Sequence, residues 1–147
     1  MRETIQINYV VGLLLLVNAC QSEEEIKRQK YITEGKQLYK TYCANCHQAD
    51  GTGLANLYPP LNGSDYLAKK DSVICLIRSG QQGPIIVNGQ TYNRIMPANP
   101  QLSELEIAEI ATYIYNKWGN ETVTTDIKTV REQLAQCAKP SGQAVAP

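Results

Sequence analysis

The sequence Cys43-Ala44-Asn45-Cys46-His47 is the most informative stretch of this chain. Two residues separate the thiols of Cys43 and Cys46, and the imidazole of His47 follows directly. This C-x-x-C-H spacing is typical of the covalent attachment of a c-type haem, in which both thiols bond to one porphyrin and the histidine binds its iron. We therefore expect Cys43 and Cys46 to hold one haem and His47 to be the first axial ligand.

Two other chemistries use a C-x-x-C pair. A zinc site usually needs a second close pair of cysteines or histidines. The remaining cysteines, Cys20, Cys75 and Cys137, are isolated, and His47 is the only histidine. A thioredoxin-like dithiol expects a βαβ context, which the sequence pattern does not show. Haem attachment is therefore the favoured interpretation.

The second axial ligand follows by elimination. Because His47 is the only histidine, coordination by two histidines of one chain is excluded. Methionine is the usual second ligand of electron-transfer haems. The chain has two methionines, and Met1 is expected to be removed with a leader. Met96 therefore remains as the expected ligand, with a role as core filler as the alternative.

Composition and charge suit one ordinary domain with appendages. The chain has 147 residues, of which 43% are hydrophobic and 19% charged, which is typical of a soluble domain with a modest core. Lys and Arg total 14, as do Asp and Glu, so the net charge is zero. The sequence has no block of basic residues that would indicate nucleic-acid binding. With a net charge of zero, it also has no strong overall electrostatic field to steer a partner.

The N-terminal region has the pattern of an export signal. Residues 9–17 form an apolar run that is too short to span a bilayer but suits a signal-peptide core. The following Val17-Asn18-Ala19-Cys20 resembles the lipobox of bacterial lipoproteins, which implies a signal peptide over 1–19 and lipid on Cys20; a plain secretory signal is the alternative. Residues 20–29 are then expected to form an acidic tether. The protein is thus expected to be exported and membrane-anchored, facing the periplasm or the outer surface.

Two helices are predicted on either side of a region that is mostly loop. Apolar residues recur at helical spacing from Tyr31 to Cys46. A second helix is predicted over Ser103–Trp118, where Ser103 and Glu106 make a capping box. The face of this helix that carries Glu109 is expected to be exposed to solvent. Shorter elements are predicted between them, namely a helix ending at Ser79 and half of a hairpin at Ile85-Ile86-Val87.

Residues 30–120 resemble a class I cytochrome c domain of the monohaem, His/Met-ligated type. The resemblance rests on features in a fixed order: Gly35, Tyr39 and Cys43 at intervals of four, the C-x-x-C-H motif, Tyr58-Pro59-Pro60-Leu61, Met96-Pro97, and Glu106 to Ile114 running into Lys117-Trp118-Gly119-Asn120. It implies an all-α fold, small and helical, with short loops around one covalently bound haem c.

The resemblance also implies particular contacts. The first and last helices should cross, with Gly35 and Tyr39 against Ile110 and Tyr113. The Pro59 carbonyl should accept a hydrogen bond from Nδ1 of the haem-binding histidine, and the Met96 thioether should lie across the haem. Side chains that are candidates to meet the haem propionates are Arg78, Tyr92 and Arg94.

Residues 121–147 extend beyond the usual end of the family. Ile127, Val130 and Cys137 lie on one stripe of a short predicted helix, and the tail after it is expected to be disordered. Cys75 and Cys137 are left over once haem and lipid are assigned. In an oxidising compartment they are expected to form a disulfide; two buried free thiols are the alternative.

These features together predict a membrane-tethered electron carrier. It would pass one electron between respiratory or other redox protein partners and would not itself be an enzyme. No small-molecule substrate and no nucleic acid are expected. The alternatives are a haem subunit of a larger oxidoreductase, and a small haem enzyme or sensor whose sixth iron position is open.

Overall fold

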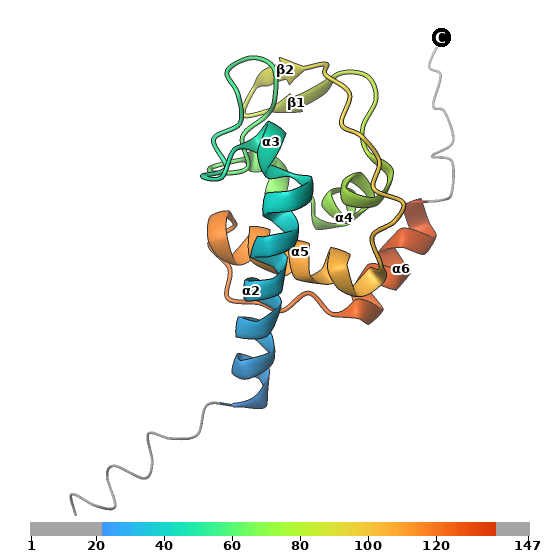
Figure 1. The fold of residues 1–147 in the computed structure, drawn as a ribbon. Helices are drawn as coiled ribbons and strands as arrows, with labels where there is room; N and C mark the ends of the chain where they lie inside the picture. The colour runs from blue at the N-terminus through green and yellow to red at the C-terminus, as the bar shows by residue number, and fades with distance from the viewer. Residues whose placement is uncertain (1–21, 138–147) are drawn as a thin grey trace, which may run out of the picture.

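The computed structural model describes residues 22–137, which fold around two crossing helices (Figure 1). The elements in chain order are α2 (Glu23–Tyr42), α3 (Ala44–His47), the 3-10 helix η1 (Asp65–Ala68), α4 (Lys70–Ser79), β1 (Ile85–Val87), β2 (Gln90–Tyr92), α5 (Glu104–Trp118) and α6 (Ile127–Cys137). This mostly helical architecture confirms the predicted fold class. None of the described helices is long and apolar enough to cross a membrane.

Helix α2 begins earlier than expected, and this corrects the acidic tether predicted over 20–29. The Ser22 hydroxyl caps the helix by accepting a hydrogen bond from the Glu25 backbone N–H at 3.3 Å. The acidic residues from Glu23 on therefore occupy the first turn, where the helix dipole favours negative charge. Arg28 pairs with Glu25 at 2.6 Å and donates to Asn116 of α5 at 2.8 Å. Capping and polar contacts stabilise this end of the helix. The periodicity of apolar residues, on which the prediction depended, does not indicate such contacts.

The predicted single helix through Cys46 is divided at Cys43. This residue has φ −121° and ψ −37°, outside regular helical geometry, and α3 starts directly after it. Its backbone N–H still donates to the Tyr39 carbonyl at 2.9 Å. The C-x-x-C-H segment thus begins at the junction of the two helices.

The crossing of α2 and α5 forms the centre of the core. Gly35 lies so close to α5 that a Cβ there would clash with the Glu109 carbonyl and stand 2.9 Å from the Tyr113 Cβ. One turn along α2, the Tyr39 ring lies 5.4 Å from the ring of Tyr113 and 5.1 Å from that of Trp118. The contact of Gly35 and Tyr39 with α5 that the resemblance implied is present. It also covers Glu109, which is only 7% exposed, so the prediction that this face of α5 is exposed to solvent is wrong for Glu109.

Helix α5 starts and ends as the sequence predicted. The Glu106 carboxylate accepts a hydrogen bond from the Ser103 backbone N–H at 2.7 Å, while the Ser103 hydroxyl accepts one from the Glu106 N–H at 3.3 Å. The bond from the Ser103 backbone N–H, together with one that the Ser103 hydroxyl donates to the same carboxylate at 2.8 Å, holds the pKa of Glu106 below its usual value. The apolar stripe Ile107, Ile110 and Ile114 is buried.

The described part of the C-terminal extension covers α4 and α5. Helix α6 forms in the expected region and buries Val130 completely. Before it, the Thr125 N–H donates to the Thr112 hydroxyl of α5 at 2.9 Å. Cys75 of α4 and Cys137 of α6 are joined by a disulfide, with their Cα atoms 5.7 Å apart. The predicted tail, signal peptide and Cys20 lie outside the described residues.

Removing this disulfide is expected to loosen the extension. The bridge closes a loop of 62 residues, for which chain entropy predicts a stabilisation of about 4 kcal/mol. We expect the Cys75→Ser/Cys137→Ser variant to lose roughly 2–4 kcal/mol in denaturant unfolding. Because the bridge lies outside the pocket described below, the haem spectrum of the folded variant should be unchanged. Non-reducing peptide mapping that finds two alkylatable thiols in the wild type would contradict the bridge.

Candidate functional site

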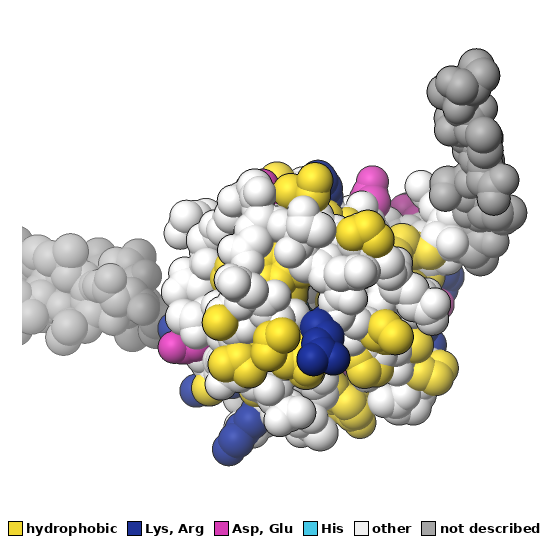
Figure 2. All heavy atoms as spheres, turned by 90° about the horizontal axis from the view of Figure 1, so that it is seen from above, with side chains coloured by type: hydrophobic (Ala, Val, Ile, Leu, Met, Phe, Trp, Pro, Cys, Tyr) yellow, Lys and Arg dark blue, Asp and Glu magenta, His cyan; other side chains and the backbone are white. Residues whose placement is uncertain are grey.

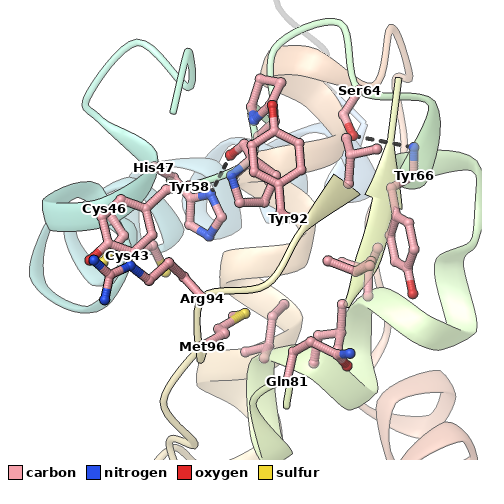
Figure 3. Close-up of a pocket in the computed structure, with 18 of the residues that line it drawn as sticks. Cys43, Cys46, His47, Tyr58, Ser64, Tyr66, Gln81, Tyr92, Arg94 and Met96 are labelled. Atoms are coloured by element: carbon pink, nitrogen blue, oxygen red, sulfur yellow. Dashed lines mark hydrogen bonds between the residues drawn. The ribbon is translucent and has the colours of Figure 1, made fainter. Parts of the chain in front are cut away.

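One large apolar cavity lies beside the C-x-x-C-H segment (Figure 3). Its volume is about 320 Å³, within the range of small-molecule and cofactor sites. The walls come from α2, α3, the loop to η1, η1 itself, α4, the hairpin, the segment before α5 and α5. Lining side chains include Leu61, Leu67, Val73, Leu76, Ile77, Ile85, Val87 and Ile114. Such a wall excludes water from whatever group the pocket holds.

His47 is fixed at one side of this cavity. Its Nδ1 lies 3.0 Å from the Pro59 carbonyl, so the ring in its Nδ1–H form donates this hydrogen bond, as the resemblance implied. The bond sets the tautomer and leaves the unprotonated Nε2 free to bind a metal ion. Burial lowers the pKa of His47 against the opposing effect of the Pro59 bond, which favours the neutral ring that a metal ligand requires.

The loop that carries Pro59 is itself held by backbone hydrogen bonds. The Leu54 N–H donates to the Tyr58 carbonyl at 3.0 Å, and the Leu61 N–H donates to the Gly51 carbonyl at 2.7 Å. The Pro59 carbonyl is therefore presented by a fixed turn rather than by a free loop. This explains how a proline distant in sequence orients His47.

Cys43 and Cys46 line the same cavity as partly buried free thiols. Burial, with a smaller contribution from the nearby Cys46, raises the pKa of Cys43 to about 12. Both cysteines and His47 line this one cavity. A porphyrin bonded to the two sulfurs would therefore lie in the pocket beside His47.

The Met96 side chain enters the pocket from another element than His47, the segment that follows β2 (Figure 3). Two backbone hydrogen bonds of 3.0 Å pair Met96 with Gln81 as an isolated antiparallel bridge. Gly80, at φ +72°, packs against the Met96 carbonyl, where a Cβ would clash. The sequence predicts a helix that ends at Ser79 but not the pairing of Gln81, because nothing local to residues 80–81 indicates pairing with residue 96.

The three propionate candidates separate in the structure. Tyr92 and Arg94 line the cavity, whereas Arg78 does not. Arg78 instead donates from Nη1 to the Pro100 carbonyl at 3.0 Å. That bond occupies Nη1 at the end of α4, while Nε is buried without a hydrogen-bond partner among the described residues. A contact of Arg78 with a propionate stays a prediction. Arg94 is the only Lys, Arg, Asp or Glu among the residues that line the cavity.

The donor set fits a covalently held haem. Two thiols, an imidazole with one nitrogen free, and a thioether face a cavity whose wall is otherwise mostly apolar. Within residues 22–137, no three His, Cys, Asp or Glu side chains gather as a metal site, which leaves the zinc alternative without the ligands it would need.

Fold and pocket together define a small helical domain built to hold haem. Residues 31–114, more than half of the chain, match the family model described as cytochrome c oxidase, cbb3-type, subunit III. The chain belongs to this family of cytochrome c domains, and its cofactor is haem c. Electron transfer through that haem is its function.

Similar proteins include a cytochrome c and the subunits of larger enzymes. Cytochrome c-552 of Thermus thermophilus is 37% identical over 92 residues, which cover 59% of this chain and 70% of that protein. The CcoP subunit of the cbb3-type cytochrome c oxidase of Rhodobacter capsulatus is 31% identical, over 81% of this chain and 38% of CcoP. The cytochrome c subunit of a quinone alcohol dehydrogenase of Gluconobacter oxydans is 28% identical, over 66% of this chain and 22% of that subunit. The chain thus spans only a minor part of the last two relatives.

A methyl group at residue 80 is expected to displace Met96. Gly80→Ala would place its Cβ against the Met96 carbonyl and so push apart the bridge that positions the side chain. We expect the spectral signs of methionine ligation to weaken in the haem-loaded variant. Gly83→Ala is the matched control, because Gly83 also has a positive φ, +80°, but a methyl group there would meet no atom within 4 Å. Equal effects of the two substitutions would assign the loss to backbone strain alone.

Proposed function

We propose that this cytochrome is a membrane-tethered electron carrier whose haem is bound to Cys43 and Cys46, with iron between His47 and Met96. The observation that carries the proposal is the placement of an imidazole and a thioether, two side chains of the kind that bind haem iron, in one apolar cavity. Each is fixed independently: His47 by the Pro59 carbonyl at 3.0 Å, and Met96 by the bridge to Gln81.

This arrangement suits transfer of electrons rather than catalysis on a substrate. When bound, the haem supplies a one-electron change at its iron. The chain contributes two ligands that stay in place in both oxidation states, so little has to move during transfer. The thioether of Met96 favours reduced iron and raises the potential, while the neutral ring of His47 is held in one orientation.

An absorption spectrum of the full-length, haem-loaded protein tests this proposal. A low-spin spectrum in both oxidation states, with a weak band near the red edge of the visible in the oxidised form, is expected. The reduced protein should not bind carbon monoxide readily. A high-spin spectrum with ready carbon monoxide or peroxide binding would overturn the carrier and favour an enzyme or sensor with an open sixth position.

The membrane tether is part of the proposal and depends on lipid at Cys20. Only two residues separate Cys20 from Glu23, the start of α2. The C-x-x-C-H segment follows the other end of this 20-residue helix, which is about 30 Å long at about 1.5 Å per residue. Figure 1 shows α3, which carries this segment, at the end of α2 away from Glu23, so a haem held there would lie away from the anchor. Cys20→Ser should release the protein from the membrane fraction; retention there would refute lipidation as the anchor.

A second candidate function is the haem relay of a larger oxidoreductase. The names of two relatives favour it, since they are a subunit of a cbb3-type oxidase and a cytochrome c subunit of a dehydrogenase. The α6 extension, which covers α4 and α5, would then be a natural contact element. Stoichiometric co-purification with a catalytic subunit would support the relay, and purification as a single species would support the free carrier.

A further inference from the structure

The backbone directly after His47 has a conformation that ordinarily only glycine adopts. Gln48 has φ 62° and ψ 159°, in a region that is essentially confined to glycine. An ordinary left-handed residue has nearly the same φ but a ψ of about 47°. A strained conformation of this kind persists only where the surrounding structure holds it, and such residues cluster at functional sites. We therefore expect specific groups of the fold to hold Gln48 in place.

Two donors hold the carbonyl of Gln48. The hydroxyl of the buried residue Tyr39 in α2 donates to it at 2.7 Å, and the Gly51 N–H donates to it at 3.2 Å. Rotation of ψ towards the ordinary left-handed value would turn this carbonyl away from both donors. The shorter bond comes from a side chain whose ring packs on the rings of Tyr113 and Trp118. The strained backbone is therefore held against a side chain that the core itself fixes.

The segment after Gln48 carries the contacts that fix His47. The Gly53 N–H donates a hydrogen bond to the His47 carbonyl at 3.0 Å. Gly53, at φ +68°, also packs so closely on the carbonyls of Tyr58 and Pro59 that a Cβ there would clash. The Pro59 carbonyl in turn accepts the proton on Nδ1 of His47. A change in the backbone of Gln48 would therefore move Gly53 and, with it, the carbonyl that orients the imidazole.

We propose that Tyr39 is a positioning residue for the axial histidine. Its hydroxyl holds the Gln48 backbone in the glycine-like conformation, and this keeps the Pro59 carbonyl in place to accept the histidine proton. Tyr39 does not line the cavity, so it acts through the backbone and not by contact with the haem. Its bond ties α2, which precedes the two cysteines, to the residue that follows the histidine. The inference rests on the proposed function, in which His47 binds the haem iron.

Hydrogen exchange of the Nδ1 proton of His47 tests this role in the full-length, haem-loaded protein. NMR of the reduced form follows this proton, which exchanges with solvent when its bond to Pro59 opens. Hydrophobic side chains make up much of the surface at this end of the molecule (Figure 2), which limits the access of water to the ring. The exchange rate is divided by that of the buried Ile110 amide of α5, so that a general loss of stability cancels. Tyr39→Phe should raise this ratio about fivefold, which corresponds to the loss of one hydrogen bond.

Tyr113→Phe is the matched control. Tyr113 is a buried tyrosine of the same aromatic cluster, and within residues 22–137 its hydroxyl forms no hydrogen bond. Its loss should leave the ratio within about twofold of the wild type. An unchanged ratio in Tyr39→Phe, or an equal rise in Tyr113→Phe, would overturn the positioning role.

Gln48→Gly provides a rescue, because glycine adopts positive φ without steric cost. Gln48→Gly alone should keep the wild-type ratio, and adding Tyr39→Phe to it should change the ratio by less than about twofold. An equal effect of Tyr39→Phe in both backgrounds would show that the hydroxyl does not act through Gln48 and would overturn the proposal. The absorption spectrum of the wild type tests the carrier function separately, because it reports the iron ligands and not the exchange of a proton in the variants.

Discussion

Replacing Met96 by alanine is expected to convert the haem iron from six-coordinate, low-spin to high-spin or water-ligated. The described residues offer no second histidine or methionine in the pocket, so no protein side chain of the same kind takes its place. Loss of the thioether removes its preference for reduced iron. The potential should fall by a sizeable part of the about 0.8 V that axial ligands span. Absorption spectra and a redox titration measure both effects.

The matched control is Asn93→Ala, which shortens another side chain of the same segment. Asn93 is exposed and does not line the cavity, so its loss should leave the spectrum and the potential nearly unchanged. Carbon monoxide should bind the reduced Met96→Ala protein and not the control. An unaltered red-edge band in Met96→Ala would show that another group binds iron and that Met96 only fills the wall.

Gly35→Ala is expected to destabilise the fold, although alanine ordinarily stabilises a helix relative to glycine by about 1 kcal/mol. The new methyl group would clash with the Glu109 carbonyl and stand 2.9 Å from the Tyr113 Cβ. Both obstacles belong to the buried helix α5, which cannot yield without moving the core. Overpacking of this kind costs roughly 1–3 kcal/mol, and because backbone is involved we expect a loss near the upper end.

Denaturant unfolding of the haem-loaded chain measures this loss, with Lys36→Ala as the control. Lys36 is the next residue of α2 and is exposed, so its substitution should change the free energy of unfolding by less than about 0.5 kcal/mol. Gly35→Ala should also raise the susceptibility of α2 to hydrogen exchange, because α2 and α5 would separate. A variant as stable as the wild type would mean that the helices can shift apart at little cost.

The sequence could predict the parts of the site that depend on local chemistry. The spacing of Cys43, Cys46 and His47 is a covalent requirement of the haem and does not depend on the rest of the fold. The capping box at Ser103 and the hairpin turn at Asn88-Gly89 are likewise local, and both are present in the structure. Asn88 and Gly89 have φ of 51° and 76°, the left-handed values that this turn requires.

The sequence alone could not predict contacts between distant segments. Residues 23–29 carry little apolar periodicity, yet they are helical because Ser22 caps them and Arg28 contacts α5. Glu109 looks like a surface residue in its own helix and is buried because α2 crosses over it. Arg78 of α4 donates a hydrogen bond to the Pro100 carbonyl, 22 residues further along the chain, a contact that no local pattern indicates.

The amino-acid sequence by itself determined that this is a haem protein, which residues are suited to hold the haem, and where its main helices lie. These properties follow from covalent spacing, capping and periodicity within a few residues. Only the tertiary structure decided how Met96 is held by Gln81 and Gly80, and that Glu109 is buried where α2 crosses α5. Those properties arise from backbone pairing and side-chain exposure across long separations, because only the folded chain brings such segments together.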